Sequence, residues 1–369
     1  MKTVDNHEHL SYPFLPEINF EMDLPYFLTQ TYLGNDLISS GMPENLIHTE
    51  NWLPSEKFKY LEKPCGEDQS EQRWKELKPH LENVRNTIYY RYLLIALRDL
   101  YGLNEEEIDE SNWKKTSLNI RERSKDYLKW SQEILNKMKV YKVILDIDGG
   151  TTLPNDKIIN DERLVQVVRM DEFIHGNLKV AKRFVKEKKV HSFDDYLDAL
   201  NQAFEASVKA GAVGVKSGLA YERILFYDDV GKSDAERVFS KGLNNVSLQE
   251  KKMFEDFMMH AVYEGCAKHK LPFQIHTGVQ AGNYNTLTNA NPTHLTNFFQ
   301  KFSYVSFDLF HGGYPFIQEA GILAKYFPNV YVDACWLAHI SPAAYKRGLD
   351  EWLEIVLLTR FLRGVGITE

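Results

Sequence analysis

Cysteine is scarce in this chain of 369 residues, and the few cysteines present exclude a disulfide framework. There are three of them, Cys65, Cys266 and Cys335, which lie far apart and form no CxxC pair. Disulfide-stabilised secreted domains need paired cysteines at close spacing, so we expect these three to be reduced thiols. The chain also begins with Met1-Lys2 directly before its first strand, which leaves no room for a signal peptide. We therefore expect a cytoplasmic protein.

Two further absences narrow the class of partner. No apolar run approaches the roughly 20 residues that a membrane-spanning helix needs, so no membrane partner is expected. Basic residues are not in excess, because 44 Lys and Arg against 52 Asp and Glu give a formal net charge of −8. Proteins that bind nucleic acids through phosphate contacts need positive charge, so a nucleic-acid partner is not expected either. A small-molecule substrate remains, and the sequence leaves open whether the chain forms a homo-oligomer.

Short apolar strands alternate with longer amphipathic helices over the second part of the chain. After a first strand that ends at His7 and His9, strands are expected at 142–148, 164–169, 212–216, 273–276, 305–311 and 330–333. Helices are expected between them, for example over 193–210 and 248–270. This alternation is typical of a parallel sheet built from βαβ units. A (β/α)8 TIM barrel with insertions reaches this length, so we expect an α/β barrel over residues 1–369, with seven strands recognisable.

The segment 10–140 follows a different pattern, because it is helical and rich in aromatic residues. Residues 85–100 are apolar at helical spacing, and Gly102 follows them as a helix stop. Another helix is expected to open near 111–113, and a third covers 125–139. We therefore expect a large helical insertion after strand one, over residues 10–140.

The first strand carries the most informative motif of the chain, Asp5-Asn6-His7-Glu8-His9. Residues two apart in a strand point to the same face, so both imidazoles would project together from one strand end. Two neutral imidazoles side by side are a good start on a metal site.

Other polar residues fall at the carboxyl ends of later strands. Lys216, His276 and His311 each end a predicted strand, and Gly312-Gly313 after His311 leaves room for a ligand to approach. The carboxyl ends of barrel strands share one face, where active sites lie, so these side chains are expected to converge with the first histidine pair. Asp308 lies three residues before His311 and is expected to face elsewhere.

This series of residues resembles the amidohydrolase superfamily. That family is a (β/α)8 barrel with His-x-His on strand one, Lys or another ligand on strand four, His on strands five and six, and Asp on strand eight. The long helical insertion is similar to the family 2 and uronate-isomerase-like branches. The resemblance implies that His7, His9 and His276 are metal ligands for a divalent metal, with zinc first and manganese or iron as alternatives.

The resemblance also implies roles for the other strand-end residues. His311 would contact a second metal or the substrate. Lys216 would be either a carboxylated bridge between two metals or a free cation near a substrate carboxylate. His311, Lys216 and Asp333 are thus the candidate catalytic residues.

Substrate binders are expected from three further side chains. Tyr221 and Arg223 follow Lys216, and Arg169 ends strand three, with a solvated or salt-bridged role as the alternative for each. Lys216 and Arg223 together favour a substrate that bears a carboxylate. Asp146 and Asp148 are open to two interpretations, as strand-end ligands or as turn residues before Gly149-Gly150.

The eighth strand and its Asp are missing from the pattern. Asp333 belongs to strand seven by count, and residues 357–369 contain no Asp. Synonymous codons exist for residues 357–367 whose shifted reading frame encodes a peptide ending in Gly-Gly-Asp, so a frameshift before the metal-binding Asp is one hypothesis. The alternative is that residues 363–368 form a short closing strand and Asp333 substitutes for the missing carboxylate.

Three functions follow as expectations. The first is metal-dependent hydrolysis, in which metal-activated water attacks a C–N or ester-like bond. The second is sugar-acid isomerisation or metal-dependent decarboxylation on the same fold. The third is a truncated, catalytically impaired remnant that lacks the strand-eight Asp.

Overall fold

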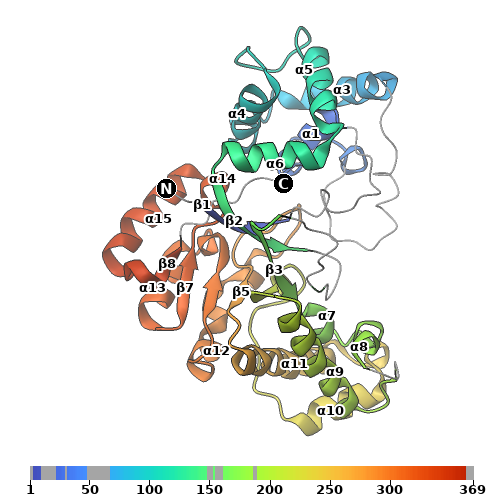
Figure 1. The fold of residues 1–369 in the computed structure, drawn as a ribbon, viewed down its shortest axis with the longest axis vertical. Coiled ribbons are helices and arrows are strands. Elements are labelled where there is room, and N and C mark those ends of the chain that lie inside the picture. Colours follow the sequence, from blue (N-terminus) through green and yellow to red (C-terminus); the bar gives the residue numbers. More distant parts are fainter. Residues whose placement is uncertain are drawn as a thin grey trace.

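Eight parallel strands form one curved sheet in the order in which they follow along the chain (Figure 1). This computed structural model describes residues 3–9, 22–29, 31–47, 67–147, 153, 161–185 and 189–362. The strands are β1 Thr3–Glu8, β2 Val140–Asp146, β3 Leu164–Arg169, β4 Gly214–Ser217, β5 Phe273–Ile275, β6 Phe307–Leu309, β7 Val330–Asp333 and β8 Phe361–Leu362. Each strand pairs in parallel with the next, so the expected (β/α)8 type of fold is confirmed.

The eighth strand is the one that the sequence pattern misses. Phe361 and Leu362 pair with Val332 and Asp333 at the edge of the sheet. Two residues are too few to show any periodicity, which is why only seven strands are recognisable from the sequence. The alternative closing strand over 363–368 lies outside the described residues.

The central strands are buried on both faces. Every residue of β4, β5 and β6 is buried. In a parallel barrel, helices cover the outer face while side chains fill the inner face, so strands of this type are apolar runs without alternation. Polar residues therefore stand out where the strands end.

The two longest helices that cover the outer face begin at clear capping signals. Helix α9, Phe193–Lys209, and helix α11, Leu248–His269, both begin with a capping box, formed by Ser192 with Asp195 and by Ser247 with Glu250. The predicted helices 193–210 and 248–270 are thus confirmed. The other helices of this layer are α7 Asp171–Ile174, α8 Leu178–Phe184, α10 Lys232–Lys241, α12 Thr296–Lys301, α13 Ile317–Tyr326, α14 Leu337–Ile340 and α15 Pro342–Ile355.

Aromatic side chains join α11 to the sheet. The ring of Tyr263 lies 4.5 Å from the ring of Phe273 on β5, 4.6 Å from Phe298 on α12 and 5.2 Å from Phe307 on β6. Full burial of a side chain of this size stabilises the fold by about 1.5–3 kcal/mol. The long helix α11 is therefore a firm support for the strand ends beside it.

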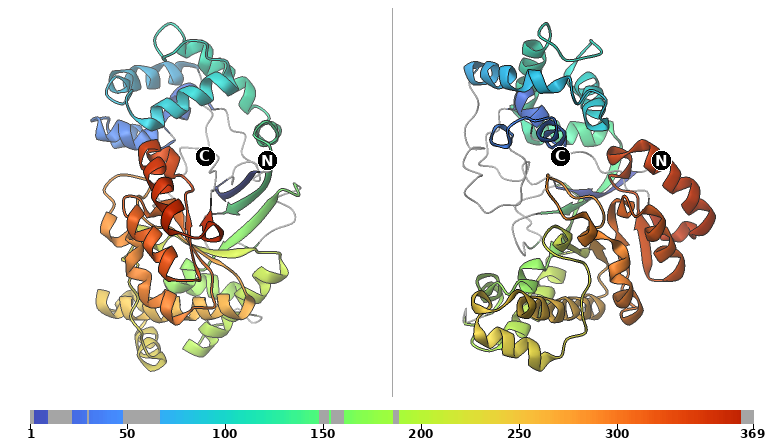
Figure 2. Two further views of the ribbon diagram at one scale, coloured as in Figure 1. Left: turned by 90° about the vertical axis from the view of Figure 1, so that its left-hand side faces the viewer. Right: turned by 180° about the vertical axis from the view of Figure 1, so that it is seen from behind.

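A block of helices with its own core lies between β1 and β2 in the chain (Figures 1 and 2). It contains α1 Leu24–Thr29, α2 Leu33–Ser39, α3 Glu67–Leu81, α4 Ile88–Tyr101, α5 Trp113–Ser124 and α6 Tyr127–Lys137. Trp74 and Trp113 stack in its core with ring centroids 5.2 Å apart. Among the described residues, no helix is both long and apolar enough to cross a membrane.

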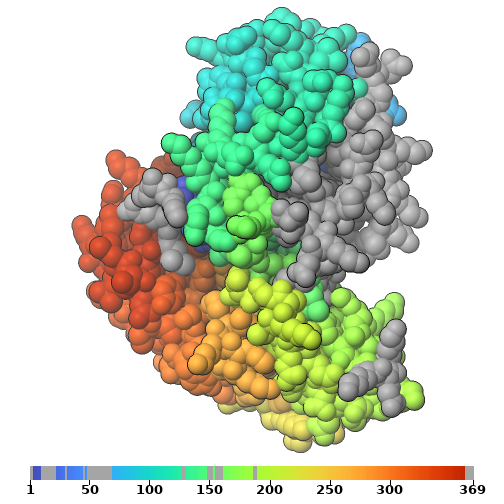
Figure 3. Space-filling model, viewed as in Figure 1, coloured from blue at the N-terminus to red at the C-terminus, as the bar shows by residue number. Residues whose placement is uncertain are grey.

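The helical block contacts the loops that follow β5 and β7. The ring of Tyr32 lies 4.6 Å from that of Trp336, and the hydroxyl of Tyr92 donates to the carbonyl of Ala338 at 3.3 Å. The side-chain amide of Asn283 donates to Ser39 at 3.1 Å. In the space-filling view the block (cyan and green) lies above the C-terminal helices (orange and red) (Figure 3). The block therefore borders the carboxyl ends of the strands.

Candidate active site

Four histidines from three strand ends lie together. His7 belongs to β1, His9 follows it, His276 comes directly after β5, and His311 is the second residue after β6. Ring centroids are 4.9 Å apart for His7 and His9, 5.1 Å for His7 and His311, and 4.5 Å for His276 and His311. The curvature of the sheet thus brings residues some 300 positions apart in the sequence into one cluster, at the predicted positions.

A left-handed turn directs His311 into this cluster. His311 has φ 62°, and Gly312 and Gly313 follow with φ 56° and 64°. A Cβ at Gly312 would lie 2.7 Å from Trp352 and one at Gly313 would lie 3.2 Å from Ala320. The expectation that these glycines leave room for a ligand is therefore wrong. Their space is filled by helix side chains, and they allow the chain to turn tightly beneath His311.

Hydrogen bonds assign protons to two of these rings. Nε2 of His276 lies 2.9 Å from the carbonyl oxygen of Val279, so this nitrogen carries the proton and donates it. Nδ1 of His276 then accepts from Nε2–H of His311 at 3.1 Å. Nδ1 of a neutral His311 is then an acceptor to which the thiol of Cys335, 3.7 Å away, can donate, and the backbone carbonyl oxygen of Cys335 lies 3.3 Å from the same nitrogen. The thiol is a site residue that the sequence analysis missed, since nothing in the sequence marks its proximity to His311.

The imidazoles are held in their neutral form. Burial lowers the pKa of His7 and of His276 well below the ordinary value of 6.5, and nearby positive charge on Lys216 lowers both further. The same two causes lower the pKa of His311 to about 3. Neutral imidazole is the form that binds metals, so the protonation states suit a metal site at any physiological pH.

The cluster fits a divalent metal in two respects. Its donor atoms are imidazole nitrogens, and the rings of His7, His276 and His311 are in the neutral form. Nδ1 of His7 is buried and has no hydrogen-bond partner among the residues that the structure describes, so this nitrogen is not committed to another group. The rings of His276 and His311 instead bond to each other and to their surroundings. Within the described ranges, no group of three or more His, Cys, Asp or Glu side chains is arranged around one point. Metal binding therefore requires the His276–His311 hydrogen bond to open.

Lys216 lies in the middle of the cluster. It belongs to β4 and is only 1% exposed, and its Nζ lies 3.3 Å from the ring centroid of Phe310. Nζ has no hydrogen-bond partner among the residues that the structure describes. Burial lowers the pKa of this amine to about 8. A buried cation without a partner is costly, which suits a group that awaits an anion.

Arg169 and Asp146 form a buried pair beside His9. Two nitrogens of Arg169, at the end of β3, donate to the two carboxylate oxygens of Asp146, at the end of β2, at 2.8 and 2.6 Å. The ion pair with Arg169 holds the pKa of Asp146 below its usual range. The carbonyl of Asp146 lies 3.0 Å from Nδ1 of His9 and fixes the orientation of that ring. Asp146 thus acts as an ion-pair partner, while Asp148 lies outside the described residues.

Two aspartates lie in the barrel interior close to the cluster. Asp333 accepts from the side-chain amide of Asn6 and, at 2.8 Å, from the backbone N–H of Cys335. Asp308 accepts from Gln274 at 3.4 Å, and burial together with the nearby charge of Asp333 raises its pKa well above the ordinary range. The expectation that Asp308 faces elsewhere is wrong. Strand alternation ends at Leu309, and the turn after it returns His311 to the same side.

The two remaining substrate-binding candidates lie in different surroundings. The ring of Tyr221 is 4.6 Å from that of His276, and its hydroxyl accepts from the N–H of Ala281 at 3.0 Å. Arg223 instead pairs with Glu255 and Asp256 on α11. Its guanidinium is paired with these carboxylates, which is the salt-bridged role given as the alternative, and a substrate contact of Arg223 stays a prediction.

Comparisons with known proteins show what the sequence and the fold are similar to. Residues 188–362 match a family model described as Amidohydrolase. Protein fluG of Emericella nidulans is 28% identical over 236 residues, which are 58% of this chain and 26% of fluG, so the chain spans about a quarter of that relative.

Two solved structures share the fold over almost the whole chain. The uronate isomerase of Thermotoga maritima is 16% identical with a TM-score of 0.71, covering 98% of this chain and 84% of the isomerase. The glucuronate isomerase of Caulobacter crescentus is 17% identical with a TM-score of 0.70, covering 99% and 80%. The family match over residues 188–362 and these shared folds make the chain similar to proteins of the amidohydrolase type.

Proposed function

We propose that this protein is a metal-dependent hydrolase that cleaves a C–N or ester-like bond of a small substrate bearing a carboxylate. One observation carries the proposal: four imidazoles and a buried lysine, from the ends of β1, β4, β5 and β6, converge at one end of the sheet. In barrels of this type the carboxyl ends of the strands form the active-site face.

A divalent metal would be held by His7, His9 and His276, with zinc as the first choice for imidazole ligands and manganese or iron as alternatives. When bound, such an ion polarises a carbonyl oxygen and lowers the pKa of water beside it. The free Nδ1 of His7 supports this assignment.

The chain's own residues would bind and orient the substrate. The ammonium of Lys216 would pair with the substrate carboxylate, since its Nζ lies over the face of Phe310 and has no hydrogen-bond partner among the described residues. Nε2–H of His311 would donate to the substrate once it leaves His276, and Asp333 would accept a proton. Tyr221 would cover the outer side of His276 and limit the access of water.

Isomerisation of a sugar acid is the second candidate. It is favoured by the fold shared with the uronate isomerase of Thermotoga maritima and the glucuronate isomerase of Caulobacter crescentus. A divalent metal and a group that holds a carboxylate would suit either reaction, so the cluster could serve both.

Substrate panels separate the two reactions. The zinc- or manganese-loaded protein is assayed with N-acyl amino acids and carboxylated esters, and in parallel with hexuronates, with His7→Asn as the inactive control. Release of acid or amine from the first set of substrates supports the hydrolase function. Conversion of a hexuronate to a ketose instead supports the isomerase function and contradicts the hydrolase function. No turnover with either set in protein that holds stoichiometric metal contradicts both and leaves the catalytically impaired remnant.

A further inference from the structure

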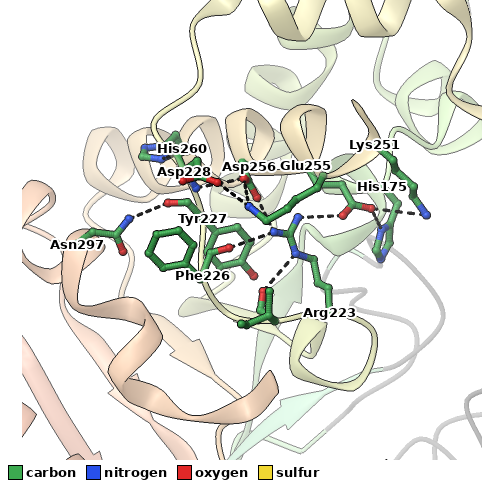
Figure 4. A network of polar contacts seen from close by, with 12 residues as sticks. His175, Arg223, Phe226, Tyr227, Asp228, Lys251, Glu255, Asp256, His260 and Asn297 are labelled. Carbon is green, nitrogen blue, oxygen red and sulfur yellow. Dashed lines mark hydrogen bonds and ion pairs between the residues drawn. The ribbon is translucent and has the colours of Figure 1, made fainter. Parts of the chain in front are cut away.

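The segment from Gly218 to Asp228, which follows β4, forms a wall of the histidine cluster. Its Tyr221 packs on His276. Figure 4 shows Arg223, Phe226, Tyr227 and Asp228 of this segment beside Glu255 and Asp256 of α11. The segment leaves β4 through a short helical turn, in which the N–H of Tyr221 donates to the carbonyl of Gly218 at 3.1 Å and that of Arg223 to Leu219 at 2.9 Å. Tyr221 and Arg223 therefore belong to one turn and move together.

Arg223 anchors this turn to helix α11. Its Nη1 lies 2.9 Å from Glu255, and its Nη2 pairs with Asp256 and also donates to the carbonyl of Phe226 at 3.2 Å (Figure 4). The side chains of Arg223, Glu255 and Asp256 are only 10%, 8% and 1% exposed. The planar guanidinium thus grips two successive carboxylates of one helix, which fixes both position and orientation.

A second bridge joins the same turn to α11. His175, just after α7, lies 3.0 Å from Glu222 through Nε2 and 3.0 Å from Glu255 through Nδ1. These two carboxylates raise the pKa of His175 to about 10, so the bridge is charged at neutral pH. Further along, Lys252 links Asp256 to Asp228 at 2.5 and 2.8 Å. The segment is thus held at three of its residues.

The opposite side of the turn is held by the loop after β5. The hydroxyl of Tyr221 accepts from Ala281, and the side-chain amide of Gln280 donates to the carbonyl of Ala220 at 2.5 Å. His276 begins this same loop, so the turn and the histidine are coupled through Tyr221. A shift of the turn away from α11 would therefore alter the contact between Tyr221 and His276.

Stability alone does not account for such buried charges. Replacing a buried ion pair by apolar side chains is often neutral or stabilising, whereas the forked geometry of Arg with two carboxylates specifies one arrangement. We propose that Arg223 is a positioning residue, which holds Tyr221 against His276 through the ion pairs with Glu255 and Asp256. The effect of Arg223 on metal binding rests on the proposed function. The effect of Arg223 on the environment of the His276 ring does not.

The first test needs neither metal nor substrate. Metal-free protein with 13Cε1-labelled histidine is observed by NMR, and the signal of His276 is assigned by its loss in His276→Gln. Tyr221→Leu removes the aromatic ring and is expected to move this signal. Arg223→Met is expected to move it in the same direction, and His175→Gln by a smaller amount. Lys301→Met, which removes the exposed pair with Asp229 beyond this segment, is the matched control and should leave the signal in place.

The results that overturn the proposal are defined for each variant. Arg223→Met leaves two buried carboxylates unpaired, so its NMR result is used only if its circular dichroism spectrum is native. If Arg223→Met does not fold, His175→Gln is the variant that tests the proposal. A His276 signal that stays at its wild-type position in the folded variants, while Tyr221→Leu moves it, contradicts the role of Arg223. A signal that Tyr221→Leu does not move contradicts the contact itself.

A double-mutant cycle separates positioning from general stability. The dissociation constant for Co²⁺ is measured in wild type, Arg223→Met, Tyr221→Leu and the double variant. Arg223→Met is expected to weaken Co²⁺ binding about 10-fold, in the range typical of groups that orient metal ligands, and to have no further effect once Tyr221 is replaced. Equal losses in both backgrounds overturn the proposal. Absence of Co²⁺ binding in the wild type contradicts the proposed function and leaves the NMR test to decide on Arg223.

Discussion

The amine of Lys216 lies 3.3 Å from the centre of the Phe310 ring, and this face is its main neighbour in the cluster. A cation at this distance from an aromatic face gains about 2 kcal/mol when desolvated, which is less than the cost of removing an ammonium from water. The lysine thus stays poorly satisfied in the absence of an anion, and we expect this to affect how the stability of the protein depends on pH.

The stability of the protein is expected to reflect the pKa of Lys216. This pKa falls from the ordinary 10.5 to about 8 in the folded state. Between these values the unfolded chain binds more protons, so the contribution of Lys216 to the free energy of unfolding rises with pH. The cost of burying the ammonium is of the order of 3 kcal/mol below pH 8 and is relieved toward pH 10.

Lys216→Met is expected to remove this dependence. The variant should unfold at a higher temperature than wild type at pH 7, and the difference should shrink as the pH rises to 10. Thermal unfolding followed at pH 7, 8, 9 and 10 measures it. A difference that is constant over this range would mean that Lys216 does not titrate there.

The turn at Gly312 is expected to tolerate no side chain. Gly312 has φ 56°, and a Cβ there would lie 2.7 Å from Trp352 and 2.8 Å from Leu337. Gly211 offers a matched control, because its φ of 94° is also left-handed but nothing lies within 4 Å of an added Cβ. Gly211→Ala should cost about 1 kcal/mol from backbone strain alone, whereas Gly312→Ala should cost about 3 kcal/mol or more from strain and overpacking.

Urea unfolding of the two glycine variants checks this prediction. Equal losses would show that the contact with Trp352 relaxes without cost, and the account of how His311 is directed into the cluster would then need revision.

Much of this arrangement is predictable because it is local. The histidine spacing in β1, the strand ends at Arg169 and Asp333, and the capped helices α9 and α11 follow from periodicity and capping within a few residues. The convergence of the four histidines follows from the geometry of a parallel barrel.

The remainder depends on contacts that no local pattern encodes. Arg223 was open to either a substrate or a salt bridge, and only the packing of α11 places Glu255 and Asp256 beside it. The inward face of Asp308 depends on where strand alternation stops, and the space beside Gly312 depends on Trp352, forty residues later in the chain. The two-residue strand β8 is too short to carry a signal.

The hydrogen bonds of the histidine pair predict one tautomer for His311 in the metal-free protein. Nε2 should carry the proton and Nδ1 should be unprotonated, facing the thiol of Cys335. Nitrogen-15 chemical shifts of the imidazole distinguish the two forms. Cys335→Ala removes the thiol donor, so Nδ1–H should then donate to the backbone carbonyl of residue 335, whereas Cys335→Ser should keep the wild-type form. A proton on Nδ1 in the wild type would contradict the assignment.

The metal content of the purified protein shows whether the histidine cluster holds a divalent ion. Purified protein is equilibrated with zinc, passed over a desalting column and analysed for metal by mass spectrometry, with His7→Asn and His276→Asn as site variants and His191→Asn, an exposed histidine outside the cluster, as the control. We expect a stoichiometric divalent ion in wild type and in His191→Asn, and clearly less than one ion per chain in both site variants. Wild-type protein that holds no metal, or site variants that bind it as tightly as wild type, would contradict the account.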